Sequence, residues 1–111
     1  NAARPDCAAD HVRHIAAATD LPLILFQYPL ASGLTYPLPT LLALADEVPS
    51  VRAIKDWCGE PALAERQVVA LQGHTRPINV LSTHSAWLFQ SLVTGAAGLL
   101  SGSGSVIADL Q

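Results

Sequence analysis

Lysine is almost absent from this chain. Lysine and arginine together number six in 111 residues, and Lys55 is the single lysine. Soluble proteins usually scatter lysines over the surface, whereas arginines carry the surface positive charge here, at positions Arg4, Arg13, Arg52, Arg66 and Arg76. The lone amine is therefore a candidate for chemistry. The alternative is a strand-end lysine that extends its ammonium group to solvent.

Charged residues are scarce as a whole. They make up 14% of the chain, against 50% hydrophobic residues, and the formal charge is −3. This balance is typical of a buried α/β interior and excludes a disordered chain. Without a basic field, we expect no nucleic-acid partner.

Long apolar runs and signal-peptide features are also lacking. No run reaches the roughly 18 to 20 residues of a membrane span, so we expect no membrane partner. The two cysteines, Cys7 and Cys58, lack metal-ligand spacing, which predicts reduced thiols, no metal site and a cytoplasmic protein. The chain begins at Asn1 without a methionine, and we expect it to be a piece of a longer protein.

The apolar pattern alternates between helical spacing and short buried runs. It predicts helices over about residues 7–19, 39–47, 61–71 and 85–94, and strands over residues 23–28, 51–55, 78–82 and 98–101. A helix between successive strands indicates right-handed βαβ units and a parallel sheet. We further expect a loop at residues 102–105, with the sequence GSGS.

The strand spacing predicts an α/β fold that is part of a (β/α)8 TIM barrel. Strands that start roughly 20 to 30 residues apart repeat as barrel units do, and four βα units are half of the barrel. We therefore expect residues 1–111 to form one partial domain, the second half of a barrel. Either the other half belongs to the same natural protein or two copies pair, because a half barrel leaves sheet edges and an apolar face uncovered. The alternative is a small doubly wound sheet with helices on both faces.

Several segments carry a family resemblance. They are LPLILFQYP at residues 21–29, Gly33, IKD at 54–56, LS at 81–82 and GAAGLLS at 95–101. In this order they resemble the second half of the dihydrodipicolinate synthase and N-acetylneuraminate lyase family. The resemblance implies class I aldolase chemistry on a barrel that assembles as a homo-oligomer, a dimer or tetramer. It also implies that Lys55 forms a Schiff base with pyruvate or a related 2-keto acid, without a cofactor or metal.

The chain departs from the family pattern at several site positions. The family's proton-relaying tyrosine is Phe26 here, and a phenyl ring carries no exchangeable proton. Tyr28 lies two residues on, so it projects from the same strand face as a candidate substitute or, alternatively, as a core aromatic. Ala31 stands where the synthases have a carboxylate-binding arginine, and Thr83 and His84 replace a Gly-Asp pair.

The function expected is that of a Schiff-base-forming lyase or aldolase acting on a 2-keto acid. Lys55 and Tyr28 are the candidate catalytic residues, and the candidate substrate-binding residues are Phe26, Thr83, His84 and Leu100. One alternative is an inactive or truncated relative that serves as an assembly or ligand-binding module. Another is a phosphate-binding barrel enzyme that uses Ser103 and Ser105.

Three further expectations concern residues outside that group. We expect His11 and His14 to lie on a solvated helix face, although their spacing would allow a shared metal. Cys58 is expected to be an inert buried thiol. Asp56 alternates with Lys55 along its strand, so it should face the helices.

Overall fold

The computed structural model describes residues 4–107 and 109. Its sheet has four parallel strands in the order β1-β2-β3-β4. These are β1 (Leu23–Gln27), β2 (Val51–Asp56), β3 (Asn79–Ser82) and β4 (Gly98–Leu99). Neighbours in the sheet are also neighbours in the chain, as in a barrel wall, so the predicted βαβ repeat is confirmed.

Helices connect and follow the strands. They are α1 (Pro5–Ala18), α2 (Leu38–Glu47), α3 (Pro61–Gln67), α4 (Leu88–Thr94) and α5 (Gly104–Ile107). Two 3₁₀ turns, η1 (Leu30–Ser32) and η3 (Ser85–Trp87), precede α2 and α4, and a π-helical segment, η2 (Val68–Gln72), continues α3. Proline within the first two positions of α1, α2 and α3 presets the helical backbone there.

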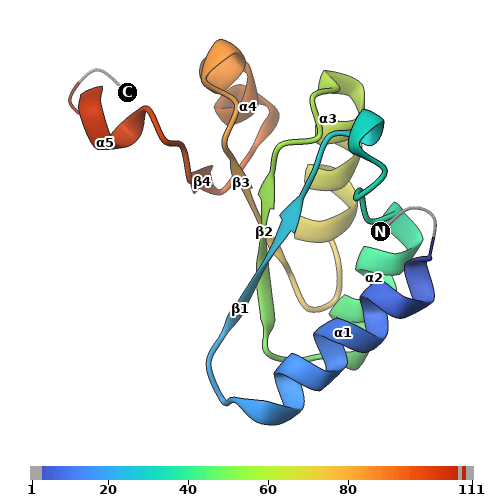
Figure 1. Ribbon diagram of the computed structural model, residues 1–111. Coiled ribbons are helices and arrows are strands. Elements are labelled where there is room, and N and C mark those ends of the chain that lie inside the picture. Colours follow the sequence, from blue (N-terminus) through green and yellow to red (C-terminus); the bar gives the residue numbers. More distant parts are fainter. Residues whose placement is uncertain (1–3, 108, 110–111) are drawn as a thin grey trace.

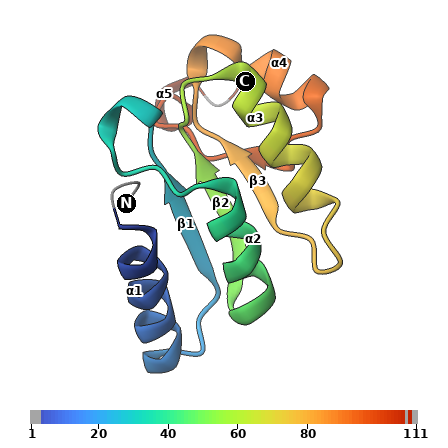
Figure 2. The same cartoon turned by 90° about the vertical axis from the view of Figure 1, so that its right-hand side faces the viewer.

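The sheet has one covered and one open face. Helices α1, α2 and α3 lie together on one side of it (Figure 1), and they stand in front of the strands when that side faces the viewer (Figure 2). On the covered face, Leu25, Ile54 and Val80 are all buried in the core. On the open face, Ile24 is 52% exposed. The doubly wound alternative is wrong for the described part of the chain, because it requires helices on both faces.

Two predicted boundaries near the carboxyl end differ from the structure. The strand expected over residues 98–101 is only Gly98–Leu99, although pairing continues one step further through the Leu100 N–H, which donates to Ser82 O at 2.8 Å. The loop expected at residues 102–105 ends earlier, because α5 begins at Gly104. Both differences occur where β4 pairs on one side only, with β3.

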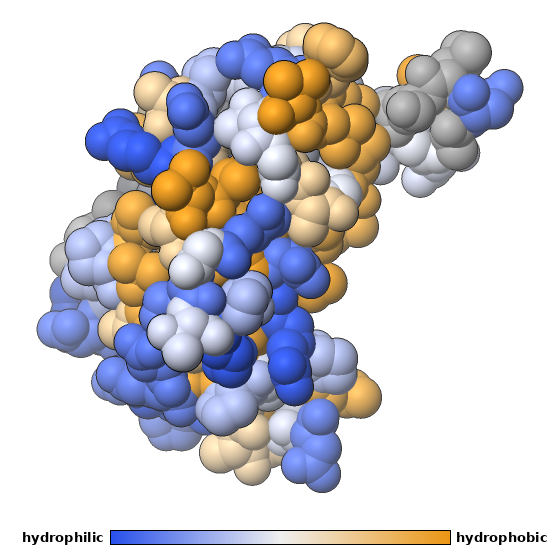
Figure 3. All heavy atoms as spheres, turned by 180° about the vertical axis from the view of Figure 1, so that it is seen from behind, coloured by the Kyte–Doolittle hydropathy of each residue, from blue (hydrophilic) through white to orange (hydrophobic). Residues whose placement is uncertain are grey.

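Apolar side chains reach the surface near the carboxyl ends of the strands. Seen from behind, they gather in the upper part of the molecule (Figure 3). Phe89 of α4 is 82% exposed, and Val93 lies one helical turn further along. In a complete barrel, a further βα unit would pack beside α4 and cover such surface. None of the described helices is both long and apolar enough to cross a bilayer.

Arg76 links the end of α2 to the start of β2 through hydrogen bonds to backbone carbonyls. Its guanidinium donates to the carbonyls of Ala45 and Val48 at the end of α2, and to Val51 O at 2.8 Å. Helix ends leave carbonyl groups without helical partners, and a planar five-donor fork satisfies several of them at once. Arg76 is half-buried, so the expectation that all the arginines serve the surface is wrong for this one.

Candidate active site

Lys55 lies in a row of side chains that crosses the sheet. In the parallel register, Lys55 pairs with Phe26 on one side and with Leu81 on the other, and Leu81 pairs with Gly98. Strand side chains alternate between faces, and Asp56, the next residue, is bonded to the helix layer. Lys55 and its partners therefore face the open side, which is the interior of a barrel.

A second row lies one step nearer the carboxyl edge. Backbone pairing continues past the strand ends, because Trp57 N donates to Gln27 O at 2.9 Å and Thr83 N donates to Asp56 O at 3.1 Å. The side chains two residues beyond the first row therefore follow it on the open face. They belong to Tyr28, Trp57, Thr83 and Leu100.

The amine of Lys55 lies against an aromatic ring. Its Nζ is 4.6 Å from the centre of the Phe26 ring, and the side chain is half-buried. The face of a benzene ring is electron-rich and attracts a cation. This contact holds the amine over the open face, at the carboxyl end of β2.

Phe26, which contacts this amine, forms an aromatic cluster with Tyr28 and Trp57. The ring centres of Phe26 and Tyr28 are 4.3 Å apart, and Trp57 lies 6.2 Å from Phe26 and 6.4 Å from Tyr28. The sequence predicted a site role for Phe26 and Tyr28 but not for Trp57. Strand alternation could have predicted that Trp57 is near the site, since it lies two residues beyond Lys55 on the same strand face.

The predicted pocket residues do not all meet. Phe26, Tyr28, Thr83 and Leu100 share the open face with Lys55. His84 comes one residue after Thr83, and its ring stacks on Trp87 with centres 3.8 Å apart. The structure therefore groups His84 with η3.

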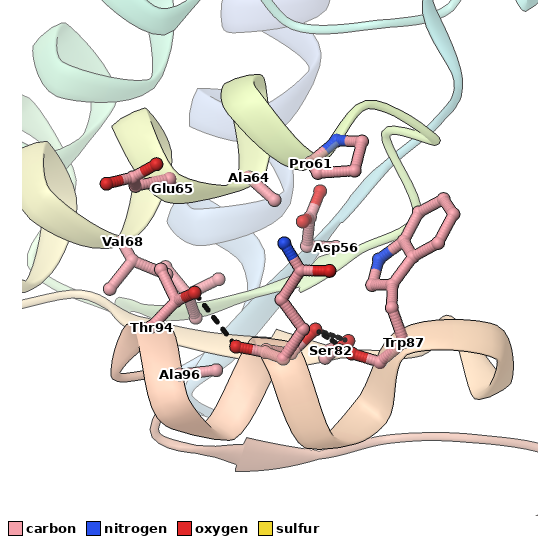
Figure 4. A pocket seen from close by; sticks show the side chains of 12 residues that line it. Asp56, Pro61, Ala64, Glu65, Val68, Ser82, Trp87, Thr94 and Ala96 are labelled. Carbon is pink, nitrogen blue, oxygen red and sulfur yellow. Dashed lines mark hydrogen bonds between the residues drawn. The ribbon is translucent and has the colours of Figure 1, made fainter.

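Two hollows border the sheet on different sides. Phe26 and Tyr28 line one of about 340 Å³ at the β1 edge, together with α1 residues such as His11. A much tighter cleft, of about 20 Å³, lies between α3 and α4 (Figure 4). Asp56 and Trp87 line this cleft on the helix side of the sheet, so it does not belong to the Lys55 face.

Hydroxyl groups line the α4 wall of that cleft. Ser82 Oγ donates to Ser91 Oγ at 3.0 Å, and Ser91 Oγ donates to Trp87 O at 3.1 Å, as drawn in Figure 4. Thr94 Oγ1 donates to Gln90 O at 2.8 Å. These hydroxyl protons are already used within the protein.

Asp56 and Cys58 are buried behind the site. Asp56 Oδ1 accepts from Cys58 N at 3.1 Å and from Gln67 Nε2 of α3 at 3.1 Å, which confirms that Asp56 faces the helices. Burial raises the pKa of the Cys58 thiol to about 12, and the nearby Asp56 carboxylate adds to the rise. Since the thiolate is the reactive form, Cys58 is an inert buried thiol, as predicted.

The remaining candidates lie apart from Lys55. His11 and His14 are both exposed on α1, as expected for a solvated face, and the residues described include no group of three potential metal ligands. Ser103 Oγ lies 2.8 Å from Ser85 Oγ and 2.7 Å from Ser101 Oγ, whereas Ser105 is exposed on α5. The two serines of the phosphate hypothesis therefore have different surroundings.

The sequence is similar to known proteins over nearly its whole length. The sequence profile of the Dihydrodipicolinate synthetase family matches residues 3–111. A 4-hydroxy-tetrahydrodipicolinate synthase of Helicobacter pylori (strain P12) is 26% identical over 101 residues, covering 91% of this chain and 32% of that protein. The 4-hydroxy-tetrahydrodipicolinate synthase of Symbiobacterium thermophilum is 33% identical over 97 residues, 87% of this chain and 32% of that protein.

Structural comparison gives the same result. The 4-hydroxy-tetrahydrodipicolinate synthase of Methylacidiphilum fumariolicum SolV superposes with a TM-score of 0.77 at 28% identity, over 88% of this chain and 32% of its own. A prophage protein of the dihydrodipicolinic acid synthase family from E. coli K12, in complex with pyruvate, superposes with a TM-score of 0.81 at 24% identity, over 90% of this chain and 34% of its own. The chain thus spans about a third of these relatives, and the predicted barrel segment is confirmed. It belongs to the Dihydrodipicolinate synthetase family.

Proposed function

We propose that Lys55 is the Schiff-base lysine of a lyase or aldolase that acts on pyruvate or a related 2-keto acid. The observation that carries this proposal is the position of the only lysine of the chain. Its amine lies on the open face of a barrel segment, at the carboxyl end of β2, where barrel enzymes hold their reactive groups.

The chemistry follows from an amine in that place. The unprotonated nitrogen attacks the keto carbon, and the resulting carbinolamine loses water to give an iminium ion. The iminium withdraws electrons, so the neighbouring carbon loses a proton and becomes an enamine. The enamine carbon then attacks an aldehyde to form a carbon–carbon bond, and the reverse sequence breaks one. Hydrolysis of the final iminium frees the lysine.

We assign roles to the surrounding residues from their positions relative to Lys55. Tyr28 is the candidate proton carrier, because its ring packs 4.3 Å from the ring that contacts the amine. Phe26, Thr83 and Leu100 would line the pocket, and His84, held on Trp87, would meet the far end of a substrate. We also propose that the whole protein is a homo-oligomer, as the family resemblance implies, and that it is cytoplasmic, as its two cysteines without metal-ligand spacing indicate.

Borohydride trapping tests the central claim. Pyruvate is the first probe, since a relative of the same fold has been solved with it. Reduction of the iminium should leave a stable adduct on the peptide that contains Lys55, detected by mass spectrometry. Lys55→Arg keeps a positive charge but removes the only lysine amine of this chain, so the adduct on that peptide should be lost.

The same experiment separates the main alternative. An unmodified Lys55 after trapping with pyruvate and other 2-keto acids would refute the Schiff-base proposal. Thermal stabilisation by a keto acid without any adduct would instead favour a ligand-binding module. That alternative is motivated by Phe26 and Ala31, which replace the tyrosine and the arginine of the family pattern. A phosphate-binding enzyme would be stabilised by sugar phosphates.

A further inference from the structure

We infer that Gln67 is a positioning residue for Lys55. Together with Gln27 and Asp56 it forms a buried polar network on the helix side of the sheet, directly behind Phe26 and Lys55. The inference rests on the proposed function of Lys55. It adds to that function a set of side chains that cannot touch the substrate and that act through the strands.

Gln67 joins two strands to one helix. It is the last residue of α3 and is 0% exposed. Its side-chain oxygen accepts from Gln27 Nε2 of β1 at 2.7 Å, and its side-chain nitrogen donates to Asp56 Oδ1 of β2 at 3.1 Å. Both ends of one amide therefore hold neighbouring strands at a fixed separation.

The network extends into the loop after β1. Gln27 Nε2 also donates to Tyr36 O at 2.9 Å, and Gln27 Oε1 accepts from Tyr36 N at 2.9 Å. Asp56 Oδ1 accepts the backbone N–H of Cys58 on the other side. Within the described residues, every buried side-chain nitrogen and oxygen has a hydrogen-bond partner. A buried network that is fully paired holds its members rigidly.

The register transmits this rigidity to the reactive amine. Gln27 pairs with Asp56, and the preceding pair is Phe26 with Lys55. Consecutive residues of a strand point to opposite faces and are joined by a planar peptide. A twist of either strand end that broke the network would therefore swing Phe26 or Lys55 on the other side.

An amide at position 67 suits its two neighbours. One neighbour is an N–H donor of Gln27, which needs an acceptor, and the other is the Asp56 carboxylate, which needs a donor. Methionine has a similar length but can neither accept from Gln27 nor donate to Asp56, so each of these buried groups would lose one of its hydrogen bonds. Glutamate would place a second carboxylate against Asp56.

The first readout is spectroscopic. In protein labelled with ¹³C-lysine, the ε-methylene signal of Lys55 is the one that Lys55→Arg removes, and the ring current of Phe26 should shift it upfield. Gln67→Met and Gln67→Glu should lose this shift in folded protein. A folded Gln67→Met protein with an unmoved signal would overturn the inference.

The second readout is the rate of borohydride-trapped adduct formation with pyruvate. A displaced amine should slow it about tenfold or more in Gln67→Met. Val12→Ala, which opens a core cavity at α1 and leaves the network intact, controls for lost stability and should change neither readout. If Gln67→Met does not fold, Gln67→Asn, one methylene shorter, takes its place under the same criterion.

The two readouts separate this inference from the proposed function. If the unsubstituted protein forms no adduct, the Schiff-base proposal fails and the ¹³C signal alone decides the positioning of Lys55. Loss of the upfield shift in folded Gln67→Met, with the shift kept in Val12→Ala, would then support the network's role, and an unmoved signal would refute it. If the adduct forms at equal rates in all folded variants, the positioning inference fails and the proposed function stands.

Discussion

Lys55 and Phe26 face one another across neighbouring strands, with the amine nitrogen 4.6 Å from the ring centre. This contact supplies attraction for a cation but no exchangeable proton. A Schiff-base reaction needs both a placed amine and a group that moves protons at the neighbouring carbon. Phe26 supplies the first of these requirements and leaves the second to another residue.

Phe26→Tyr should therefore accelerate proton transfer. A phenol at this position would lie beside the amine, and a placed general acid or base contributes about 10² to 10⁴-fold. Exchange of the methyl protons of pyruvate for deuterium, followed by NMR in heavy water, measures enamine formation without a second substrate. Trapping with borohydride, which needs only the iminium, should change little.

Tyr28→Phe is the matched control for that experiment. If Tyr28 already carries the proton, exchange should fall in Tyr28→Phe and recover when Phe26→Tyr is added. Tyr28 would be a core aromatic if its loss leaves exchange unaltered. A rate of deuterium exchange that is unchanged by both substitutions would contradict proton transfer by a phenol on this strand.

Stability should decline at high pH because of Cys58. Its pKa is raised from the ordinary value of 9.0 to about 12. The folded state thus holds this proton more tightly than the unfolded state, so the contribution is fully present below pH 9 and is lost as the pH rises toward 12. Urea unfolding at a series of pH values should show a falling free energy of unfolding across this window.

Cys58→Ala isolates that contribution. The decline between pH 9 and 12 should become shallower in this variant, although some should remain because burial also raises the pKa of Tyr36. A native-state alkylation experiment adds a second check. The exposed Cys7 should react with iodoacetamide well before the buried Cys58. Equal labelling of the two thiols would contradict the burial of Cys58.

Arg76→Lys should destabilise the protein by about 1 to 3 kcal/mol, because a lysine cannot serve the several carbonyls that the guanidinium fork reaches. The bonds lost would include those to Val48 O and Val51 O. Urea denaturation, fitted with one common dependence of the free energy of unfolding on urea concentration, measures the loss of stability. Arg66→Lys is the matched control, since Arg66 is exposed on α3 and its Nε donates to the carbonyl of Ala62 in the same helix, at 3.2 Å. Equal losses in the two variants would argue against a special role for Arg76.

Local patterns predicted the strands and the face of Lys55 because both depend on neighbours in sequence. Alternation alone placed Asp56 on the helix side. The Gln67 network was not predictable in that way, since Gln27 and Gln67 are 40 residues apart and local spacing does not show which distant polar side chains meet. Arg76 was missed for the same reason, because its carbonyl partners lie 25 to 31 residues away.

The π-helical segment η2 determines how Gln67, which immediately precedes it, and Gln72, its last residue, are oriented around the helix axis. Gln67 reaches Gln27 and Asp56, and Gln72 donates to Gly95 O at 2.7 Å and accepts from Val80 N at 3.1 Å. Five residues overshoot one turn of an α-helix, which takes about 3.6, but they match the i→i+5 spacing of a π-turn. Removing one residue from this segment would therefore rotate one glutamine away from the sheet. The length of η2 couples the strand ends at Lys55 to the β3–β4 side of the barrel wall.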